Sequence, residues 1–247
     1  MTRNRPIPDV SDADRSYVQG LVIHDDSALL GFAKPAGLPV QTRGNRGRNL
    51  DHMLWAFARS NGKRPKLVHR LDAGTSGVIV AAKTQPAAAA LSEGFASRTA
   101  EKTYLALVSG TLPEGDAGSI DAPLARVSVD GRDRIVAARS DIRGAKSAQT
   151  HWRLLHRSDT FGLMELKPKT GRMHQIRVHL EALGCPILGD PIYGSGRMTG
   201  PRVMLHAQRL KLPHPDGGML DLETPVPPDF EAYARKNGLL LQPASSA

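Results

Sequence analysis

Residues 77–82 of this 247-residue chain read Gly-Val-Ile-Val-Ala-Ala, a run that is apolar at nearly every position. A strand with one face in water alternates between apolar and polar residues, whereas a strand covered on both faces is apolar throughout. The run therefore predicts a strand in the interior of a sheet. A chain built around such a strand must supply layers that cover both of its faces.

Other segments predict both strands and helices around this run. Apolar stretches at 21–24 and 29–33 flank a polar turn at 25–27 and predict two strands joined by that turn. Strands are also predicted at 104–108, 152–155, 163–166 and 203–212, and helices at 50–59, 84–97 and 174–183. Residues 111–148 are rich in Gly, Asp and Arg and are expected to form excursions from the sheet. Together these elements favour a sheet-dominated α+β fold over a series of parallel β-α-β units.

The two ends of the chain are expected to be tails. Residues 1–18 hold prolines and charges of both signs without periodicity, which is typical of a flexible segment and not of a signal peptide. Residues 236–247 are expected to form a C-terminal tail. No apolar run approaches the roughly 20 residues that span a bilayer, so no membrane partner is predicted. The one cysteine, Cys185, excludes an internal disulfide and fits a reducing, cytoplasmic compartment.

The charge balance points to a polyanionic partner. Thirty-three Lys and Arg residues outnumber twenty-four Asp and Glu residues, and the formal net charge is +9. Such a balance favours polyanionic partners, because each neutralised phosphate releases condensed counterions, although a soluble protein that happens to be basic would have the same composition. Only 4% of the residues are aromatic, so rows of stacked bases are not the expected mode of binding. The loop containing Arg43, Arg46 and Arg48 suits phosphates, although a solvated loop would have the same composition.

A first cluster of polar residues directly precedes the predicted buried strand. His69, Arg70 and Asp72 are followed by Gly-Thr-Ser-Gly at 74–77, where the glycines permit a tight backbone and the hydroxyl groups can hydrogen-bond it. Such a loop would hold Asp72 rigidly at the edge of a strand. An aspartate in a loop of this composition is, however, often only a turn former.

A second cluster lies at the start of the helix predicted at 174–183. Its members are Arg172, His174, Gln175, Arg177 and His179. They make a basic helix start that suits phosphate or carboxylate. His174 and His179 are five residues apart, so they do not share a helix face as zinc ligands at i and i+4 would, and no metal is expected. A third stretch at 184–194, dense in Gly and Pro, predicts a fixed connection without an obvious catalytic group.

In these motifs the chain resembles the RluA-type family of pseudouridine synthases. That family's signature around its catalytic aspartate, His-Arg-Leu-Asp followed two residues later by Thr-Ser-Gly, is matched at 69–77. Further matches stand in the family's order at 34–37, 102–106, 171–177, 189–194 and 205–207. They cover nearly everything from about residue 20 to residue 225. One such motif would be moderately specific, whereas several in order are very specific.

The resemblance implies a fold and a set of site residues. The fold would be that family's catalytic domain over 19–235, a mixed or antiparallel, bent central sheet flanked by helices and loops, with a cleft across the sheet. Asp72 would be the catalytic aspartate, Tyr104 the tyrosine that packs on the target base, and Arg177 the arginine that ion-pairs with the aspartate. Residues expected to bind RNA or to help flip the base are Arg70, His69, Arg172, His174, Gln175, Arg43, Arg46 and Arg48. Met173 stands where the family usually has Thr, which puts only the packing at the helix entry in doubt.

The implied reaction converts uridines in structured RNA, either ribosomal or transfer RNA, to pseudouridine. It breaks the N1–C1′ bond, turns the uracil and rejoins it through C5, after the base has left the stack at a cost of a few kcal/mol. Asp72 must be ionised, as a nucleophile or as a base on the sugar, and the Arg177 guanidinium would keep it so in a water-poor cleft. Tyr104 would supply an aromatic face and a phenol near the proton that C5 loses. No cofactor is expected.

Two other functions fit parts of the sequence. A non-catalytic RNA-binding or RNA-folding module could use the same basic residues. A glycosidase-like hydrolase would also use an aspartate at C1′, but it needs two carboxylates at a defined separation, and no second acid lies in a matched motif. Larger relatives often carry an N-terminal S4-type RNA-binding domain, and none is expected in the roughly 20 residues before the first matched strand. The loops at 43–48 and 111–148 would then select the RNA, with a monomer as the expected state.

Overall fold

The apolar run lies in strand β4, Ser76–Ala82, and all seven residues of this strand are buried. β4 pairs antiparallel with β2, Leu29–Lys34, in a register that places Phe32 opposite Ile79. The predicted interior strand is therefore confirmed. It enters the core immediately after the loop that contains Asp72.

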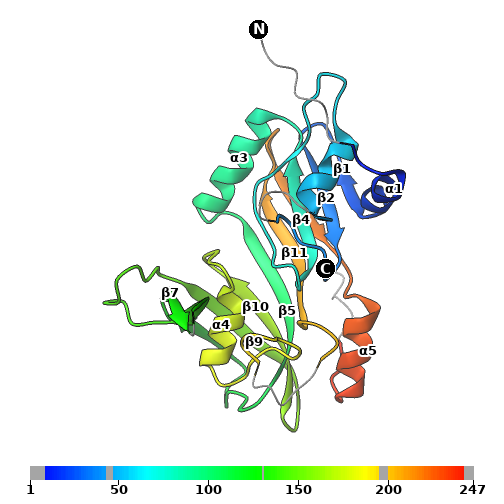
Figure 1. The fold of residues 1–247 in the computed structure, drawn as a ribbon. Coiled ribbons are helices and arrows are strands. Elements are labelled where there is room, and N and C mark those ends of the chain that lie inside the picture. Colours follow the sequence, from blue (N-terminus) through cyan, green and yellow to red (C-terminus); the bar gives the residue numbers. More distant parts are fainter. Residues whose placement is uncertain (1–8, 43–46, 130, 195–199, 242–247) are drawn as a thin grey trace. The chain divides into compact units, whose positions relative to one another are not determined.

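The computed structural model describes residues 9–42, 47–129, 131–194 and 200–241. These residues form two compact units, coloured along the chain in Figure 1. The first unit contains the described residues of Met1–Ala100 together with Leu210–Thr224. The second contains those of Glu101–Arg209 and Pro225–Ala247. Asp72 thus belongs to the first unit, and Tyr104 and Arg177 belong to the second.

The first unit is a sheet with helices. Its strands follow the order β1, β2, β4, β11, and two short strands extend it, since β3 pairs with β4 and β12 pairs with β11. The strands are β1 Val22–Asp25, β2 Leu29–Lys34, β3 Lys66–Leu67, β4 Ser76–Ala82, β12 Met219–Glu223 and the second half of β11 Leu205–Pro213. The helices are α1 Asp12–Gly20, α2 Leu50–Met53, the 3₁₀ helix η2 Leu54–Phe57 and α3 Gln85–Ala96.

Helix α3 begins as the sequence predicts and covers β4. The Thr84 hydroxyl oxygen accepts a hydrogen bond from the N–H of Ala87 at 3.2 Å, which satisfies a backbone donor that the first turn leaves open. Leu91 of this helix packs in one apolar cluster with Val78 and Val80 of β4. Burial of a large apolar side chain contributes about 1.5–3 kcal/mol, so this cluster anchors the strand that follows Asp72.

The second unit is an antiparallel sheet with a separate hairpin. Its strands follow the order β11, β5, β10, β9, β6, while β7 and β8 pair with each other. The strands are β5 Glu101–Ser109, β6 Ala117–Asp121, β7 Leu124–Val129, β8 Arg132–Ala137, β9 Gln149–Ser158, β10 Phe161–Pro168 and the first half of β11. The helices are α4 Gln175–Ala182 and α5 Pro228–Lys236. The core joins residues of β5, β10, α4 and α5, among them Leu107, Met164, Leu180 and Phe230.

Most predicted elements are confirmed, and the α+β fold class with them. The strands predicted at 152–155 and 163–166 are longer, because they extend to Gln149–Ser158 and Phe161–Pro168. The helix predicted at 50–59 is a short α-helix that continues as a 3₁₀ helix and ends at Phe57. Helix α4 is followed by Gly184 at φ +88°, in the left-handed conformation that commonly ends helices.

The prediction of a flexible segment at 1–18 is wrong from residue 12 onward, because Asp12–Gly20 form helix α1. The Ser11 hydroxyl oxygen accepts a hydrogen bond from the N–H of Asp14 at 3.2 Å and caps the helix. Val18 is the buried residue of its nine. A single buried side chain leaves no apolar period in the sequence, so the pattern could not reveal the helix.

Helix α5 was not predicted either. Phe230 and Ala234, four residues apart, are its buried residues, and acidic residues in the first turn with basic ones in the last suit the helix dipole. The predicted C-terminal tail at 236–247 is wrong at Leu239, which is only 1% exposed and belongs to the core of the second unit. Within the described ranges, no helix is both long and apolar enough to cross a membrane.

Candidate active site

Asp72 lies in a loop whose backbone is tied down on both sides of it. Its side chain is partly buried, and the preceding Leu71 is 5% exposed. The carbonyl of Asp72 accepts a hydrogen bond from the N–H of Thr75 at 3.1 Å, which closes a tight turn just before β4. The loop that the sequence predicts directly before the buried strand is present, and its backbone is closed by this hydrogen bond.

A buried lysine holds the next carbonyl along this loop. Lys34, 1% exposed, donates from Nζ to the carbonyls of Pro35, Leu38 and Ala73 at 2.8, 3.0 and 3.2 Å. The Ala73 carbonyl also accepts from the N–H of Gly37 at 2.8 Å, and Gly37 has a φ of +85° that a side chain would strain. Two donors from the 34–37 segment thus fix the peptide that follows Asp72.

His69 supports the same loop from the side of β4 and α3. Its Nε2 accepts a hydrogen bond from the N–H of Val80 at 3.0 Å, so this nitrogen is unprotonated. Its ring stacks on Phe95, with centroids 4.5 Å apart and planes 25° apart. These contacts give His69 a structural position beside Asp72, in addition to the RNA-binding role that the sequence suggests.

Arg70, between His69 and Asp72, is exposed. Across the part of the chain that the structure describes, its guanidinium makes no hydrogen bond or ion pair. The side chain predicted to take the place of a displaced base is therefore at the surface of the first unit.

In the second unit, Tyr104 is a partly buried residue of β5 that lies opposite Leu166 of β10. Alternation along a strand places Lys102 on the same face as Tyr104. The Lys102 ammonium donates to the Thr170 carbonyl at 3.4 Å, and burial lowers the pKa of this lysine. The sequence motif at 102–106 contains this lysine, but its pattern assigns it no role.

Arg177 forms a buried ion pair that the sequence did not predict. Its Nε and Nη2 donate to the two carboxylate oxygens of Asp190 at 2.7 and 2.8 Å, and both residues are 6% exposed. The N–H groups of Ile192 and Tyr193 donate to Asp190 Oδ1 at 2.9 and 3.1 Å. Burial raises the pKa of Asp190, but the hydrogen bonds and charge of Arg177 outweigh it, and the pKa is lowered.

Tyr193 completes this cluster. The Arg177 guanidinium lies 5.0 Å from the centre of the Tyr193 ring, and Arg134 lies 5.1 Å from it. The Tyr193 hydroxyl is 2.9 Å from Nδ1 of His174, which stands at the entry of α4 in the left-handed conformation with φ +57°. His174 is therefore held at the helix entry by the same segment that holds Arg177. The dense glycine and proline pattern at 184–194 pointed to a fixed connection, and Asp190 is the charged group that it fixes.

The RNA contact predicted for Gln175 does not fit its burial, because the side chain is 4% exposed. Its amide donates to the Gln149 carbonyl and to the Thr150 hydroxyl at 2.9 and 3.0 Å. Its side-chain oxygen accepts from the Thr170 hydroxyl and from the N–H of Arg172 at 2.7 and 3.0 Å. Gln175 thus ties the turn before α4 to β9, while Arg172 is exposed beside it.

The remaining predicted positions divide into three cases. His179 is fully buried, its Nδ1 lies 2.8 Å from the Thr150 hydroxyl, and its Nε2 donates to the Ala122 carbonyl at 3.0 Å. Burial lowers its pKa, which favours the neutral ring.

Arg48 donates from its guanidinium to Asp14 Oδ1 of α1 at 2.8 Å and stacks over Tyr17. Arg43 and Arg46 lie outside the described residues.

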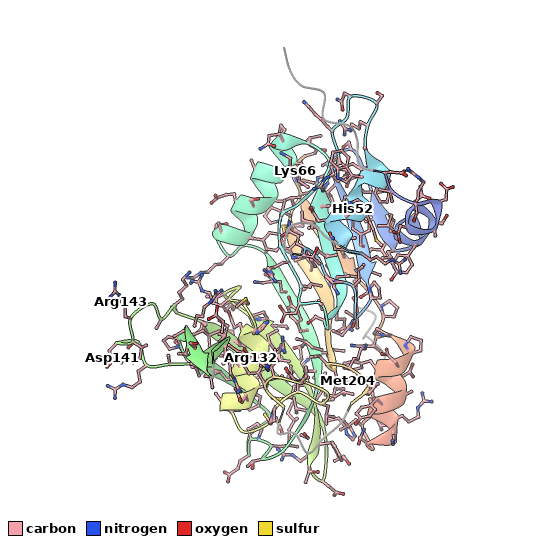
Figure 2. All side chains as sticks on the ribbon, viewed as in Figure 1. His52, Lys66, Arg132, Asp141, Arg143 and Met204 are labelled. Carbon is pink, nitrogen blue, oxygen red and sulfur yellow. The ribbon has the colours of Figure 1, made fainter. Side chains whose placement is uncertain are left out.

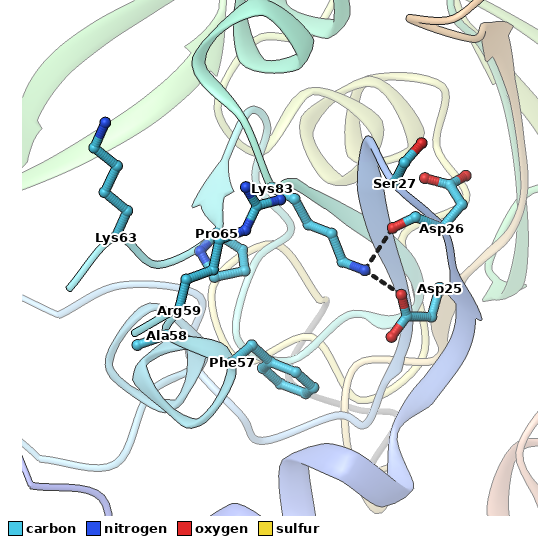
Figure 3. Close-up of a pocket in the computed structure, with 9 residues that line it drawn as sticks. All are labelled: Asp25, Asp26, Ser27, Phe57, Ala58, Arg59, Lys63, Pro65 and Lys83. Atoms are coloured by element: carbon cyan, nitrogen blue, oxygen red, sulfur yellow. Dashed lines mark hydrogen bonds and ion pairs between the residues drawn. The ribbon is translucent and has the colours of Figure 1, made fainter. Parts of the chain in front are cut away.

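A pocket of 310 Å³ in the first unit is lined by Lys83, the residue that follows β4, whereas Asp72 precedes this strand. Figure 3 shows the residues that line the pocket. Lys83, which follows β4, points its ammonium toward the Asp25 carboxylate and the Asp26 carbonyl. Burial raises the pKa of Asp26, but hydrogen bonds from His24, two backbone N–H groups and His214 lower it well below its usual range. Lys83 and Asp25 form an ion pair in this pocket, and its lining contains no residue of the matched motifs.

The β7–β8 hairpin and the loop after it carry exposed cations. Figure 2 shows Arg132 on β8, and Asp141 and Arg143 at the outer end of the following loop, where their side chains point away from the second unit. Arg126 and Asp133 form an ion pair across the hairpin with side chains that are 60% and 63% exposed. These groups form the excursion that the sequence predicted within 111–148.

Comparisons with known proteins agree with the motifs. The sequence profile of the family described as RNA pseudouridylate synthase matches residues 28–182. An uncharacterized RNA pseudouridine synthase of Zymomonas mobilis is 37% identical over 212 residues, which cover 85% of this chain and 94% of that protein. A ribosomal large subunit pseudouridine synthase D of the same organism is 34% identical, covering 92% and 75%. One of the same name from Pseudomonas aeruginosa is 35% identical, covering 85% and 69%.

Solved structures with a similar fold come from the same family. A structure titled human RNA pseudouridylate synthase domain containing 4 superposes with a TM-score of 0.77 at 27% identity, covering 93% of this chain and 98% of the other. A second, titled human RNA pseudouridylate synthase domain containing 1, gives a TM-score of 0.71 at 30% identity, covering 85% and 86%. The similarity therefore extends over both units.

Proposed function

This chain belongs to the RluA-type family of RNA pseudouridylate synthases, and we propose that it isomerises uridines of ribosomal RNA. The chain is an RNA pseudouridine synthase and hence an isomerase. Ribosomal RNA is favoured over transfer RNA because two similar proteins are named ribosomal large subunit pseudouridine synthases. The net charge of +9 suits a substrate of closely spaced phosphates.

Asp72 is the catalytic aspartate of this proposal, and the fixed backbone around it carries the assignment. A reacting group must be held within about 0.5 Å of its productive position. The carbonyl of Asp72 is bonded by Thr75, and that of Ala73 by Lys34 and Gly37. With this backbone fixed, the partly buried carboxylate can act at C1′ of the target uridine, either as a nucleophile or as a base on the sugar.

Arg177 has the role of keeping Asp72 ionised. Support for this role is the match of the 171–177 motif to the family's own. Within the second unit, the Nε and Nη2 groups of Arg177 are bonded to Asp190, and the guanidinium lies over the ring of Tyr193. These contacts orient the guanidinium.

Tyr104 is assigned to the target base. Its ring would provide an aromatic face for the uracil, and its hydroxyl would lie near the proton that leaves C5. Support comes from its position against the core of the second unit, where its strand pairs with β10 at Leu166.

Arg70 is assigned to base flipping. An exposed guanidinium without a partner among the described residues can enter the stack that the uridine leaves. Arg172 and the cations of the β7–β8 hairpin, which are exposed, would contact the RNA backbone. We propose that the protein acts as a monomer in the cytoplasm, where ribosomal RNA is its partner.

The test of this proposal is Asp72→Asn, which keeps the size of the side chain and removes its charge. Tritium release from RNA that contains 5-tritiated uridine reports the loss of the C5 proton. We expect the variant to lose at least about 1,000-fold in rate, because the group that acts at C1′ is gone. Asp216→Asn, an exposed aspartate in the same unit, is the matched control and should retain full activity.

Persistent tritium release by Asp72→Asn would disprove the assignment of the aspartate. Free uracil among the products of the wild-type protein would instead favour a hydrolase. Mapping pseudouridines in total RNA from a deletion strain then identifies the target uridine, and a missing pseudouridine in transfer RNA alone would contradict the ribosomal assignment.

A further inference from the structure

Among the described residues of the second unit, some cations are paired with carboxylates and others are not. Arg177 is paired within that unit, where both oxygens of the Asp190 carboxylate accept its hydrogen bonds. The pair is therefore close to neutral as seen from a distance of several ångströms. A reaction that develops negative charge on the uracil needs a further cation near the base.

Lys102 is the partly buried cation on the face of β5 that carries Tyr104. Its ammonium has one hydrogen bond, to the uncharged Thr170 carbonyl at a long 3.4 Å. Across the described residues, no carboxylate pairs with it. Burial lowers its pKa, which means that the charged form is incompletely solvated and would be stabilised by an anion.

Gly171 borders the Lys102 ammonium. It is exposed, and a Cβ added to it would lie 3.9 Å from the Lys102 Nζ, so a side chain at this position would stand beside the ammonium. Lys102 and Tyr104, two residues apart on one strand face, stand about 7 Å apart along the strand, so a base that packs on Tyr104 has Lys102 as a neighbour on the same strand.

We propose that Lys102 is a further catalytic residue, whose ammonium stabilises the uracil anion formed when the N1–C1′ bond breaks. The inference rests on the proposed function of the same site. The electron pair of the N1–C1′ bond moves onto the uracil, where N1 and the ring carbonyl oxygens share the charge, while Asp72 acts at C1′. When C5 bonds to C1′, an electron pair of the uracil anion enters the new bond and Asp72 returns to its starting carboxylate. C5 then loses its proton to solvent, the electrons of that C–H bond return to the ring, and N1 takes up a proton from solvent. Lys102 keeps its proton throughout.

A lysine suits this role better than an arginine would. The detached uracil must turn from N1 to C5, so the position of its negative oxygens changes during the reaction. An ammonium on a flexible four-carbon stem, with three rotatable donors, can follow that movement, whereas a planar guanidinium is matched to one fixed arrangement.

The charge of Lys102 points to the base and not to an RNA phosphate. A phosphate is charged before and during the reaction, so a contact to it strengthens binding without favouring the chemical step. The exposed Arg172 and the exposed cations of the β7–β8 hairpin already suit phosphates. A partly dehydrated ammonium gains most from a charge that appears only as the bond breaks.

The experiment compares Lys102→Met and Lys102→Arg with the wild-type protein, using single-turnover tritium release at saturating RNA and a separate measurement of the RNA Kd. We expect Lys102→Met to lose about 100- to 1,000-fold in rate with a Kd within twofold of wild type. Lys102→Arg keeps the charge and should recover part of the rate. Thermal unfolding of Lys102→Met should occur at or above the wild-type temperature, because an incompletely solvated charge has been removed.

Lys167→Met is the matched control. Lys167 lies on the neighbouring strand β10, is exposed and pairs with Glu165 at 3.3 Å, so its loss should leave the rate unchanged. Propylammonium added to Lys102→Ala supplies the missing part of the side chain, and its concentration should restore activity progressively.

Three results would overturn the role of Lys102: an unchanged rate in Lys102→Met, a weakened Kd at an unchanged rate, or a lowered unfolding temperature that accounts for the lost activity. Each of these leaves the proposed function intact as long as the wild-type protein isomerises RNA and Asp72→Asn does not. An Asp72→Asn variant with full activity would instead remove the catalytic aspartate, whatever Lys102 does.

Discussion

Arg177 and Asp190 form two parallel hydrogen bonds of 2.7 and 2.8 Å in the interior of the second unit. Two backbone N–H groups hold the same carboxylate, and the ring of Tyr193 lies against the guanidinium. The arginine assigned to the catalytic aspartate is thus oriented by a partner thirteen residues away. Its direction depends on that carboxylate and not on the helix alone.

Replacing Asp190 by Asn should destabilise the protein strongly. The variant leaves the Arg177 charge buried without its counterion, and breaking such a pair costs about 3–5 kcal/mol. Urea unfolding measures this change in the free energy of unfolding. Asp133→Asn removes the acid of the exposed Arg126–Asp133 pair and should change stability by less than about 1 kcal/mol. Equal losses of unfolding free energy in the two variants would show that the buried pair contributes no more to stability than the exposed pair.

The same pair predicts a loss of stability in acid. The pKa of Asp190 in the folded protein is lowered below the ordinary value of 3.8, so the native state favours the ionised form. Its contribution is fully present above about pH 4 and is lost as the pH falls through the folded pKa. The difference in unfolding free energy between wild type and Asp190→Asn should therefore shrink below pH 4. A difference that stays constant to pH 2.5 would contradict this assignment.

Replacing Lys34 by Met should loosen the loop that carries Asp72. The carbonyls of Pro35 and Leu38 lose a buried donor, which we expect to cost about 2–4 kcal/mol in total. Urea unfolding gives the stability, and tritium release at saturating RNA should fall as well. Lys66→Met is the control, because Lys66 is exposed and donates to the Gln85 side chain. Equal stability of the two variants would rule out a structural role for the Lys34 ammonium.

Replacing Arg70 by Ala should reduce activity without changing stability. The side chain is exposed, so the free energy of unfolding should stay within about 0.5 kcal/mol. Base flipping costs a few kcal/mol, and losing the side chain that fills the vacancy should slow single-turnover tritium release by about tenfold or more. The loss should be smaller on an RNA whose target uridine is already unpaired. Arg139→Ala, with a side chain that is 85% exposed, is the control.

Cys185 should be inert in the folded protein. The thiol is fully buried, and burial raises its pKa to about 11. Both effects suppress the thiolate that reacts with disulfide reagents. Native protein at pH 8 should react slowly with such a reagent, and protein in guanidinium chloride should react at once. Equally fast reaction in both states would show that the residue is accessible.

Local patterns were sufficient to predict β4, α4 and the position of Asp72. The apolar run at 77–82 and the glycine after α4 act through neighbouring residues, so their consequences are visible in a short stretch of sequence. Helices α1 and α5 escaped prediction because each has only one or two buried residues. Their helical state depends on packing against a core that is distant in sequence.

The sequence by itself determined the family, the catalytic aspartate of the proposal and the basic character of the surface. Only the tertiary structure decided what holds these groups. Lys34 reaches the carbonyl of Ala73 across 39 residues, His69 accepts from Val80, and Asp190 holds Arg177. The sequence shows which donors and acceptors are present but not which of them pair. Each buried group bonds to the backbone or side chain that the fold brings within about 3 Å. Those pairings fix the backbone next to Asp72 and the orientation of Arg177.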